Sequence, residues 1–468
     1  MFHIQNQNVS VHIQKQNVNT IDESINKDAQ IGTGSVLIKR VLKNSAYLFS
    51  ATGISAILSL VQGVFLARML GVEQFGLWGT ITLFTGVINN LASFRMDELV
   101  IKYVGHFTEE KDTTRAAAVF KAAALVEVLS SLVAYALIML LAPLAAQHLA
   151  KDNALTAWFL LYGLVVLFNL IFESSNGLLR IFDRFRAIAY LNVAQSVFTL
   201  IMTLIVFVGG SFFSLPPLMS IILIYMLSKL AGAIGMTLLA FQEAAFRWGN
   251  NWWVVSLTML KGYYRDLFRF ALSTNLSASI NLINKDSELL WVAYFRNPLE
   301  VGYYKLALGL INIVLLPINP MPSATYAELS REVARRNWKN VRMLLKHGSL
   351  LAAGYTLLVS LGILFLGQFF IQLAYGKDYL PAFPALLILT FGFLVANSVY
   401  WQRVALLAFG LPHFLTLVNL IAAVFKVIGY VLLVPTFGYL GCAALLAGYY
   451  IFSSFLNAVR VLHCLECR

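Results

Sequence analysis

Long runs of apolar residues, separated by short polar stretches, follow one another from about residue 44 to the end of the chain. A helix needs about 20 apolar residues to cross a bilayer, and these runs approach or exceed that length. They are too continuously apolar for strands, and a backbone in lipid must satisfy its hydrogen bonds within its own segment. We therefore predict twelve membrane-spanning helices, at about 44–66, 76–94, 117–141, 154–178, 187–208, 218–241, 267–292, 301–323, 343–370, 384–408, 413–434 and 440–462.

The first 40 residues differ from the rest of the chain. They are rich in Asn and Gln and hold few large apolar side chains, which predicts a disordered polar tail. They also lack the apolar core of a cleavable signal peptide, so the first hydrophobic helix is expected to act as the targeting signal. Over the whole chain 59% of residues are hydrophobic and 12% are charged, which excludes an ordinary soluble protein.

The 34 Lys and Arg residues are divided unequally between the two sides of the predicted membrane. Loops on the side of both termini hold 25 of them, the opposite loops hold 4, and 5 fall within or at the edge of spans. Positively charged loops are retained in the cytoplasm, so both termini are predicted to be cytoplasmic. This topology accounts for the excess of positive charge, and no binding to nucleic acid is expected.

The second half of the chain repeats features of the first half 226 positions later. The second span begins at 75–78 with Phe-Gly-Leu-Trp, and the eighth begins at 301–304 with Val-Gly-Tyr-Tyr. This repeat predicts an all-α membrane protein of two six-helix bundles, related by a pseudo-two-fold axis along the membrane normal. The predicted parts are a cytoplasmic tail (1–40), an N-terminal bundle (41–241), a cytoplasmic linker (242–266) and a C-terminal bundle (267–468).

Three stretches carry a further signal. They are Leu-Ala-Arg-Met-Leu-Gly at 66–71 followed by Phe75 and Gly76, Asp286 followed by Val-Gly-Tyr at 301–303, and Tyr-Gly-Lys-Asp-Tyr-Leu-Pro at 375–381. From about residue 36 onward the chain resembles the polysaccharide flippases of the Wzx type, in the multidrug/oligosaccharidyl-lipid/polysaccharide exporter superfamily. The resemblance implies a protein of the bacterial inner membrane that moves an undecaprenyl-pyrophosphate-linked oligosaccharide to the outer leaflet by alternating access. Its implied partners are this substrate, membrane lipid, and a glycan polymerase with export proteins.

Cations inside the spans are candidates for the substrate pathway, because a charge at the centre of an isolated helix costs about 2.5–3.5 kcal/mol on insertion scales. In a low-dielectric cavity such groups form charge-assisted hydrogen bonds to a pyrophosphate. The candidates are Arg95, Lys229, Lys285 and Lys426. For each the alternative is an ion pair, for instance with Glu127 or Glu173 in the case of Lys229 and Lys426. Lys305 lies near the outer end of its span, where its stem is expected to snorkel.

Carboxylates inside the spans have two possible roles. Glu127, Glu173, Asp286 and Glu288 are candidates to bind a coupling proton or sodium ion, or to pair with the cations. Lys285 and Glu288, for example, are three positions apart, which suits a pair within one helix.

Two other functions compete with the flippase. An ion-coupled multidrug exporter of the same superfamily favours an acidic, aromatic chamber, and the cations in mid-span argue against it. A membrane glycan polymerase or ligase needs a sizeable external segment with catalytic groups, and every predicted external loop is short, so we do not expect an enzyme.

The sequence has no G-x-x-x-x-G-K-[ST] phosphate loop, which leaves an ion gradient or the membrane potential as the energy source. No cofactor is expected, and His463, Cys464 and Cys467 lack a second pair of ligands for a metal ion.

Overall fold

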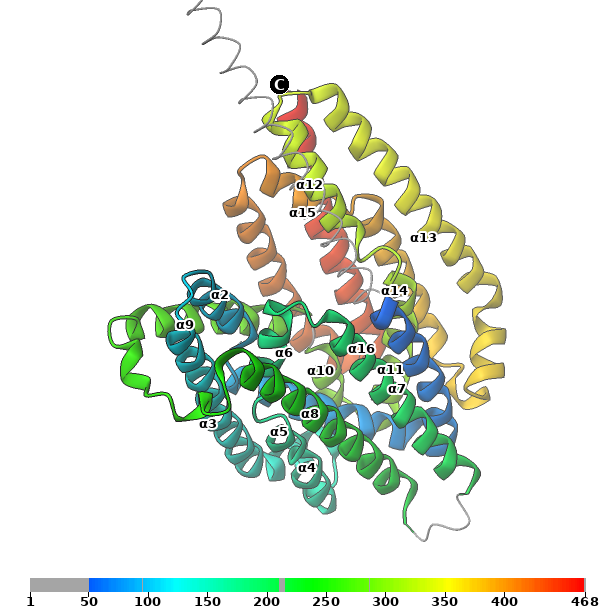
Figure 1. Ribbon diagram of the computed structural model, residues 1–468. Helices are drawn as coiled ribbons and strands as arrows, with labels where there is room; N and C mark the ends of the chain where they lie inside the picture. Colours follow the sequence, from blue (N-terminus) through cyan, green and yellow to red (C-terminus); the bar gives the residue numbers. More distant parts are fainter. Residues whose placement is uncertain (1–49, 95, 210–214, 286, 467–468) are drawn as a thin grey trace, which may run out of the picture.

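The computed structural model describes residues 50–94, 96–209, 215–285 and 287–466; for residues 276–285 it describes the backbone only. All secondary-structure elements of this part of the chain are helices, as predicted (Figure 1). They are a first helical segment at 50–92, α2 (Met96–Glu109), α3 (Thr113–Ala145), η1 (Ala146–Ala150), η2 (Asn153–Leu155), α4 (Thr156–Gly163), α5 (Val165–Phe168), α6 (Phe172–Ile181), α7 (Phe185–Val208), α8 (Pro217–Trp248), η3 (Trp252–Val254), η4 (Leu257–Leu260), α9 (Tyr264–Lys285), α10 (Glu288–Phe295), α11 (Pro298–Leu315), α12 (Met321–Ala334), α13 (Trp338–Ala374), η5 (Lys377–Tyr379), α14 (Ala382–Ser398), α15 (Gln402–Ala408) and α16 (Pro412–Glu466).

Nine segments of the described chain are long and apolar enough to cross a membrane. Two of them hold two spans each, because the helix breaks at a glycine with positive φ: Gly71 (φ 69°) in Ser50–Glu109 and Gly438 (φ 58°) in α16. The seventh predicted span is divided into α9 and α10. The prediction of about twelve spans in an all-α membrane protein is therefore confirmed.

Three further predicted spans need correction in detail. The fourth, 154–178, is broken into α4, α5 and α6, and the tenth, 384–408, is broken into α14 and α15. The eighth, 301–323, ends at Leu315, because Pro317 and Pro320 lack the backbone N–H that a continuing helix requires.

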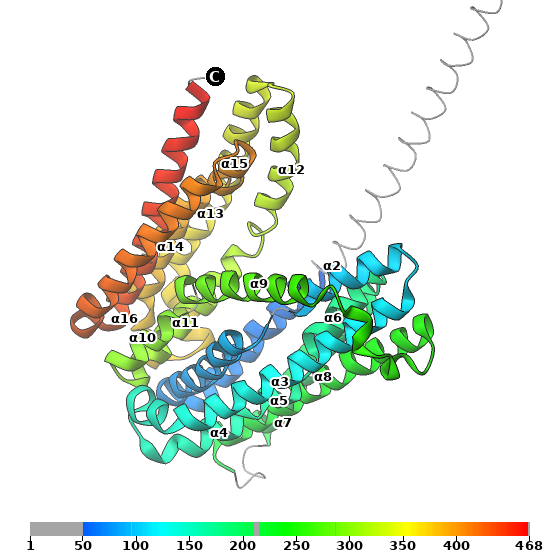
Figure 2. The same cartoon turned by 90° about the vertical axis from the view of Figure 1, so that its left-hand side faces the viewer.

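The helices form two bundles that meet at one end and diverge from it (Figure 2). One core of buried side chains draws residues from both bundles, for example Trp78 and Tyr304. Of the two other cores, one holds only residues between 94 and 271 and the other only residues between 329 and 465. The bundles thus share a core only where they meet, and we call this the closed end. The limits 41–241 and 267–468 given above for the bundles stay predictions.

At the closed end the first helical segment crosses α11 through two glycines, Gly76 and Gly302. A Cβ atom on Gly76 would overlap the carbonyl oxygen of Pro298, and one on Gly302 would overlap the carbonyl oxygen of Val72. Gly76 and Gly302 lie 226 positions apart, and so do Val72 and Pro298, so the contact is symmetric about the axis of the repeat. We call this contact the glycine crossing. It brings the two backbones together more closely than any side chain would allow.

Three side chains form four hydrogen bonds between the bundles at the closed end. Arg68 donates to the carbonyl oxygens of Leu373 and, over 2.7 Å, Ala374, where α13 ends. The hydroxyl of Tyr379 donates to the carbonyl oxygen of Ala67 over 3.0 Å, and Lys151 donates to that of Tyr294 over 2.6 Å. A cation suits the end of α13, because carbonyl groups without helical partners gather at a helix C-terminus.

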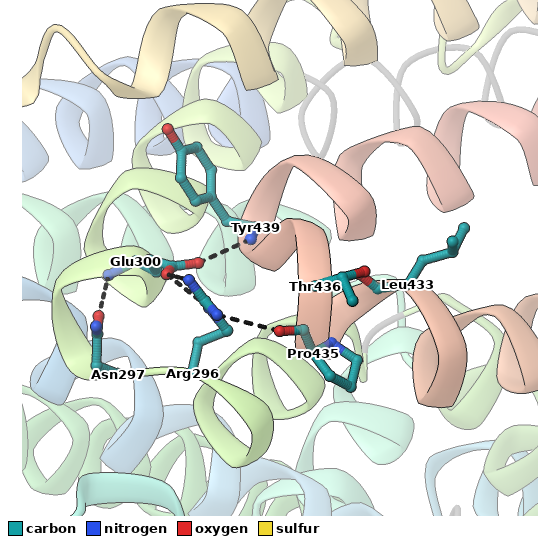
Figure 3. A network of polar contacts seen from close by, with 7 residues as sticks. All are labelled: Arg296, Asn297, Glu300, Leu433, Pro435, Thr436 and Tyr439. Carbon is teal, nitrogen blue, oxygen red and sulfur yellow. Dashed lines mark hydrogen bonds and ion pairs between the residues drawn. The ribbon is translucent and has the colours of Figure 1, made fainter.

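A network within the C-terminal bundle fixes the break in α16 (Figure 3). The carboxylate of Glu300 pairs with Arg296 at 2.7 Å and accepts the backbone N–H of Tyr439 over 3.1 Å, while Arg296 also donates to the carbonyl oxygen of Pro435. Gly438, at the break, lies against the Glu300 carboxylate, where a Cβ would overlap it. The network therefore anchors the turn of α16 to the start of α11, next to the glycine crossing.

The helix α9 lies against the N-terminal bundle rather than with the helices that follow it. Leu267 and Ala271 belong to the core of 94–271, and the amide of Asn275 donates to the carbonyl oxygen of Ser93 over 2.7 Å. The seventh span therefore connects both bundles, with α9 on the first and α10 on the second.

Candidate functional site

A hollow of about 580 Å³ lies between the bundles, beside the glycine crossing. We call it the central hollow. Its walls come from the first helical segment, α8, α10, α11 and Tyr375. Most of its lining is apolar, and the side chains that carry a hydroxyl, amide or ammonium group are those of Ser59, Tyr225, Lys305, Asn312 and Tyr375.

Lys305 is the cation of the central hollow. Its ammonium group is buried and forms no hydrogen bond within the described part of the chain. It lies 4.5 Å from the ring centre of Phe75 and 5.5 Å from that of Trp78, so two aromatic faces from the N-terminal bundle stabilise its charge. Its stem passes over Gly79, where a Cβ would come within 2.7 Å of the lysine Cδ.

The expectation that Lys305 snorkels is wrong. The start of α11 is covered by the first helical segment at the glycine crossing, so the lysine lines the central hollow and its ammonium lies buried against Phe75 and Trp78. The sequence did hold a usable signal, since Gly302 lies one helical turn before Lys305 and a glycine in a membrane helix often marks a close helix contact.

A second cavity, of about 330 Å³, adjoins the central hollow and shares Ser59 and Tyr225 with it. We call it the polar pocket. Lys229 lines it and takes part in no ion pair within the described residues, so the structure leaves the predicted cation beside the hollow rather than paired with Glu127 or Glu173. The full lining is Thr52, Ser55, Ser59, Gln62, Asn192, Gln195, Ser196, Thr199, Tyr225, Ser228 and Lys229.

A third cavity, the apolar groove, has a volume of about 380 Å³ and shares Leu60 and Ile313 with the central hollow. Its walls come from the first helical segment, α11, α13 and α14, and every side chain that lines it is apolar or a glycine. The central hollow therefore adjoins a polar cavity and an apolar one.

Lys426 lies away from the central hollow, inside the C-terminal bundle. Its ammonium pairs with Glu288 at 2.5 Å, and both side chains are only 3% exposed. The rings of Tyr430 and Tyr449 lie 5.5 and 5.1 Å from the ammonium. The structure thus brings together two predicted site residues, but as an ion pair that joins α10 to α16.

Glu127 and Glu173 serve the broken fourth span. Glu127 accepts the backbone N–H groups of Glu173 and Ser174 over 2.7 and 2.9 Å, and the Ser174 hydroxyl over 2.6 Å, in the first turn of α6. Glu173 accepts the N–H of Met96 over 3.3 Å. N–H groups at the start of a helix stabilise negative charge, which accounts for a buried carboxylate here.

Several predictions fall on residues that the structure does not describe. They concern the tail at 1–40, Arg95, Asp286 and Cys467, together with the side chain of Lys285.

Two helical bundles around a shared hollow, closed at one end, define the class of this protein: its fold is that of the MOP-superfamily transporters. The match to solved structures covers nearly the whole chain. An inward-facing multidrug resistance MATE transporter of the MOP superfamily aligns with a TM-score of 0.67 at 15% identity, over 88% of this chain and 95% of that one. The lipid II flippase MurJ, in an inward closed conformation, aligns with a TM-score of 0.66 at 16% identity, over 89% and 87%.

The chain belongs to the family described as "Polysaccharide biosynthesis protein", whose model matches residues 41–330. It is also 22% identical over 347 residues to the inner membrane protein YghQ of Escherichia coli (strain K12), which covers 74% of this chain and 95% of that protein. The chain is therefore a multi-pass membrane protein of the polysaccharide biosynthesis family, with the fold of the MOP-superfamily transporters.

Proposed function

We propose that this protein moves an undecaprenyl-pyrophosphate-linked oligosaccharide, the repeat unit of a surface polysaccharide, from the inner to the outer leaflet of a bacterial inner membrane. The observation that carries the proposal is the chemistry of the three adjoining cavities. A buried cation, a polar pocket and an apolar groove meet at one place, and a lipid-linked sugar phosphate has one part for each.

The pyrophosphate is assigned to Lys305. An ammonium group in a cavity of low dielectric constant forms strong hydrogen bonds to phosphate oxygens, and this one has no carboxylate to neutralise it among the described residues. The polyprenyl chain is assigned to the apolar groove, which begins at Leu60 and Ile313 and leaves the central hollow between the two bundles. The glycan is assigned to the polar pocket.

Transport in this proposal follows alternating access. The glycine crossing seals one end in the present state, and the divergent end admits the substrate. The positively charged loops favour the cytoplasm for the divergent end. The bundles then rock about the hollow until the crossing opens, which requires energy from an ion gradient or the membrane potential. A glycan polymerase and export proteins would act on the delivered product.

Depletion of the protein is expected to cause lipid-linked oligosaccharide to accumulate in the inner leaflet. Intact and permeabilised spheroplasts are compared by labelling the glycan with a membrane-impermeant reagent. Glycan that is labelled only after permeabilisation lies in the inner leaflet, and this result supports a flippase. Accumulation in the outer leaflet would contradict it, because the block would then follow translocation.

Removal of the cation in the central hollow is expected to slow this step. Lys305→Gln should lower delivery to the outer leaflet by about tenfold or more, since a charge-assisted hydrogen bond is worth about 1.5–3 kcal/mol. Lys305→Arg should keep most of the activity. The control is Lys339→Gln, which removes the same charge from the exposed start of α13. Equal activity of Lys305→Gln and the control would remove Lys305 from the pathway.

The fold is also that of the MATE transporters, so an ion-coupled multidrug exporter is the second candidate. Drug susceptibility of the depleted strain separates the two. A flippase predicts unchanged efflux of cationic dyes and a loss of surface polysaccharide. An exporter predicts reduced efflux of the dyes and unchanged surface polysaccharide.

A further inference from the structure

The polar pocket has a lining that is unusual inside a membrane protein. Of its eleven lining residues seven carry a hydroxyl, three carry an amide, and the last is Lys229; none is apolar and none is acidic. Polar side chains in membrane helices are costly and usually mark a pathway or a binding site.

Three helices build this lining, each with residues three or four positions apart. Helix α7 contributes Asn192, Gln195, Ser196 and Thr199, and α8 contributes Tyr225, Ser228 and Lys229. The first helical segment contributes Thr52, Ser55, Ser59 and Gln62. Positions three, four and seven apart lie on one face of a helix, so three polar faces point toward one another.

Part of this polar capacity is already in use. The amide of Gln62 donates to the carbonyl oxygen of Ser196 over 2.6 Å, and the hydroxyls of Thr199 and Ser228 are 2.5 Å apart. These bonds hold the three helices together. The hydroxyl oxygen of Ser55, in contrast, is buried and has no hydrogen-bond partner among the residues that the structure describes.

Gln195 owes its place to a glycine. A Cβ on Gly232 of α8 would overlap the side-chain amide of Gln195, so the glycine leaves room for this amide between α7 and α8. An amide of this kind both donates and accepts, as recognition of sugar hydroxyls requires.

We propose that the polar pocket binds a sugar that carries a carboxylate, that is, a uronic acid residue of the transported glycan. The hydroxyl and amide groups receive the ring hydroxyls, and Lys229 receives the carboxylate. Lys229 gives the pocket a single positive charge, which matches the single negative charge of a sugar carboxylate, and the pyrophosphate is already assigned to Lys305 in the adjoining central hollow. This inference rests on the proposed function and names the class of its substrate.

The test uses the full-length protein in nanodiscs and measures dissociation constants for three probes. The probes are methyl β-D-glucuronide, methyl β-D-glucoside and glucose 6-phosphate. We expect the glucuronide to bind about tenfold more tightly than the glucoside, because it adds one charge-assisted hydrogen bond. Equal binding of these two, no binding of either, or tighter binding of glucose 6-phosphate would overturn the proposal.

Variants assign the preference to the pocket. Lys229→Gln should reduce glucuronide binding to the level of the glucoside, and Lys229→Arg should keep the preference. Gly232→Ala should weaken both sugars while their ratio stays the same, because it displaces Gln195 and leaves the charge. Lys339→Gln should change nothing. A preference that survives in Lys229→Gln would also overturn the proposal.

Geranylgeranyl pyrophosphate separates this inference from the proposed function. If this probe binds in a way that depends on Lys305 while the two methyl glycosides bind equally, the flippase stands and the acidic sugar does not. If this probe does not bind at all, the proposed function is contradicted, because its pyrophosphate is assigned to the central hollow.

Discussion

Replacing Gly302 with alanine is expected to reduce transport by more than tenfold while the protein still inserts into the membrane. The added Cβ would overlap the carbonyl oxygen of Val72, and a backbone atom cannot turn aside as a flexible side chain can. The closed end could then close only if the helices moved apart. Gly76→Ala should produce the same defect, because its Cβ would meet Pro298 in the symmetric position.

Labelling can show that the defect lies in closure. The native cysteines are replaced by serine, Asn312→Cys is introduced into the central hollow, and an impermeant maleimide is added from the side of the glycine crossing. Labelling should rise in Gly302→Ala. The control is Gly354→Ala, because a Cβ on Gly354 of α13 meets no atom within 4 Å. Unchanged labelling and transport in Gly302→Ala would show that this contact does not control access.

Removing one partner of the Glu288–Lys426 pair is expected to be the most destabilising single change discussed. Each side chain is 3% exposed, so Glu288→Gln or Lys426→Met takes from a buried charge the partner that lies 2.5 Å away. Breaking a buried pair in this way costs about 3–5 kcal/mol, whereas two neutral groups of similar size restore most of the stability. The double variant should therefore unfold at a higher temperature than either single variant.

Thermal unfolding of the purified protein measures this effect. The exposed pair of Arg331 with Glu328 is the control, and Arg331→Gln should change stability by less than about 1 kcal/mol. A double variant that is no more stable than the single ones would contradict this prediction, because it would mean that other groups compensate the two charges.

The sequence was sufficient for the fold because the length of apolar runs and the distribution of cations are properties of the chain itself. It was less sufficient for the site. Lys229 was predicted as a cavity cation and lines the polar pocket, but Lys426, at a similar depth in its own helix, lies in an ion pair. Hydropathy gives the depth of a residue in the membrane and not the neighbour that its side chain faces.

Lys305 shows the same limit of prediction from sequence, because it was expected at the membrane surface and lines the central hollow instead. Its distance from the end of the span suggested contact with water, whereas a helix from the other bundle covers it. The break between α9 and α10 also escaped prediction, because a helix that changes from one bundle to another keeps its apolar character.

The symmetry of the glycine crossing bears on the origin of the chain. The contact is self-complementary, so a protein of half this length would form it with a second copy of itself, as in an isologous homodimer. Gene duplication and fusion would then have freed the two copies to diverge. Gly79 and Lys305 occupy equivalent positions 226 residues apart, and in the present protein one half contributes the cation and the other the space that accommodates it. A strictly symmetric ancestor would have had two lysines facing each other there, or none.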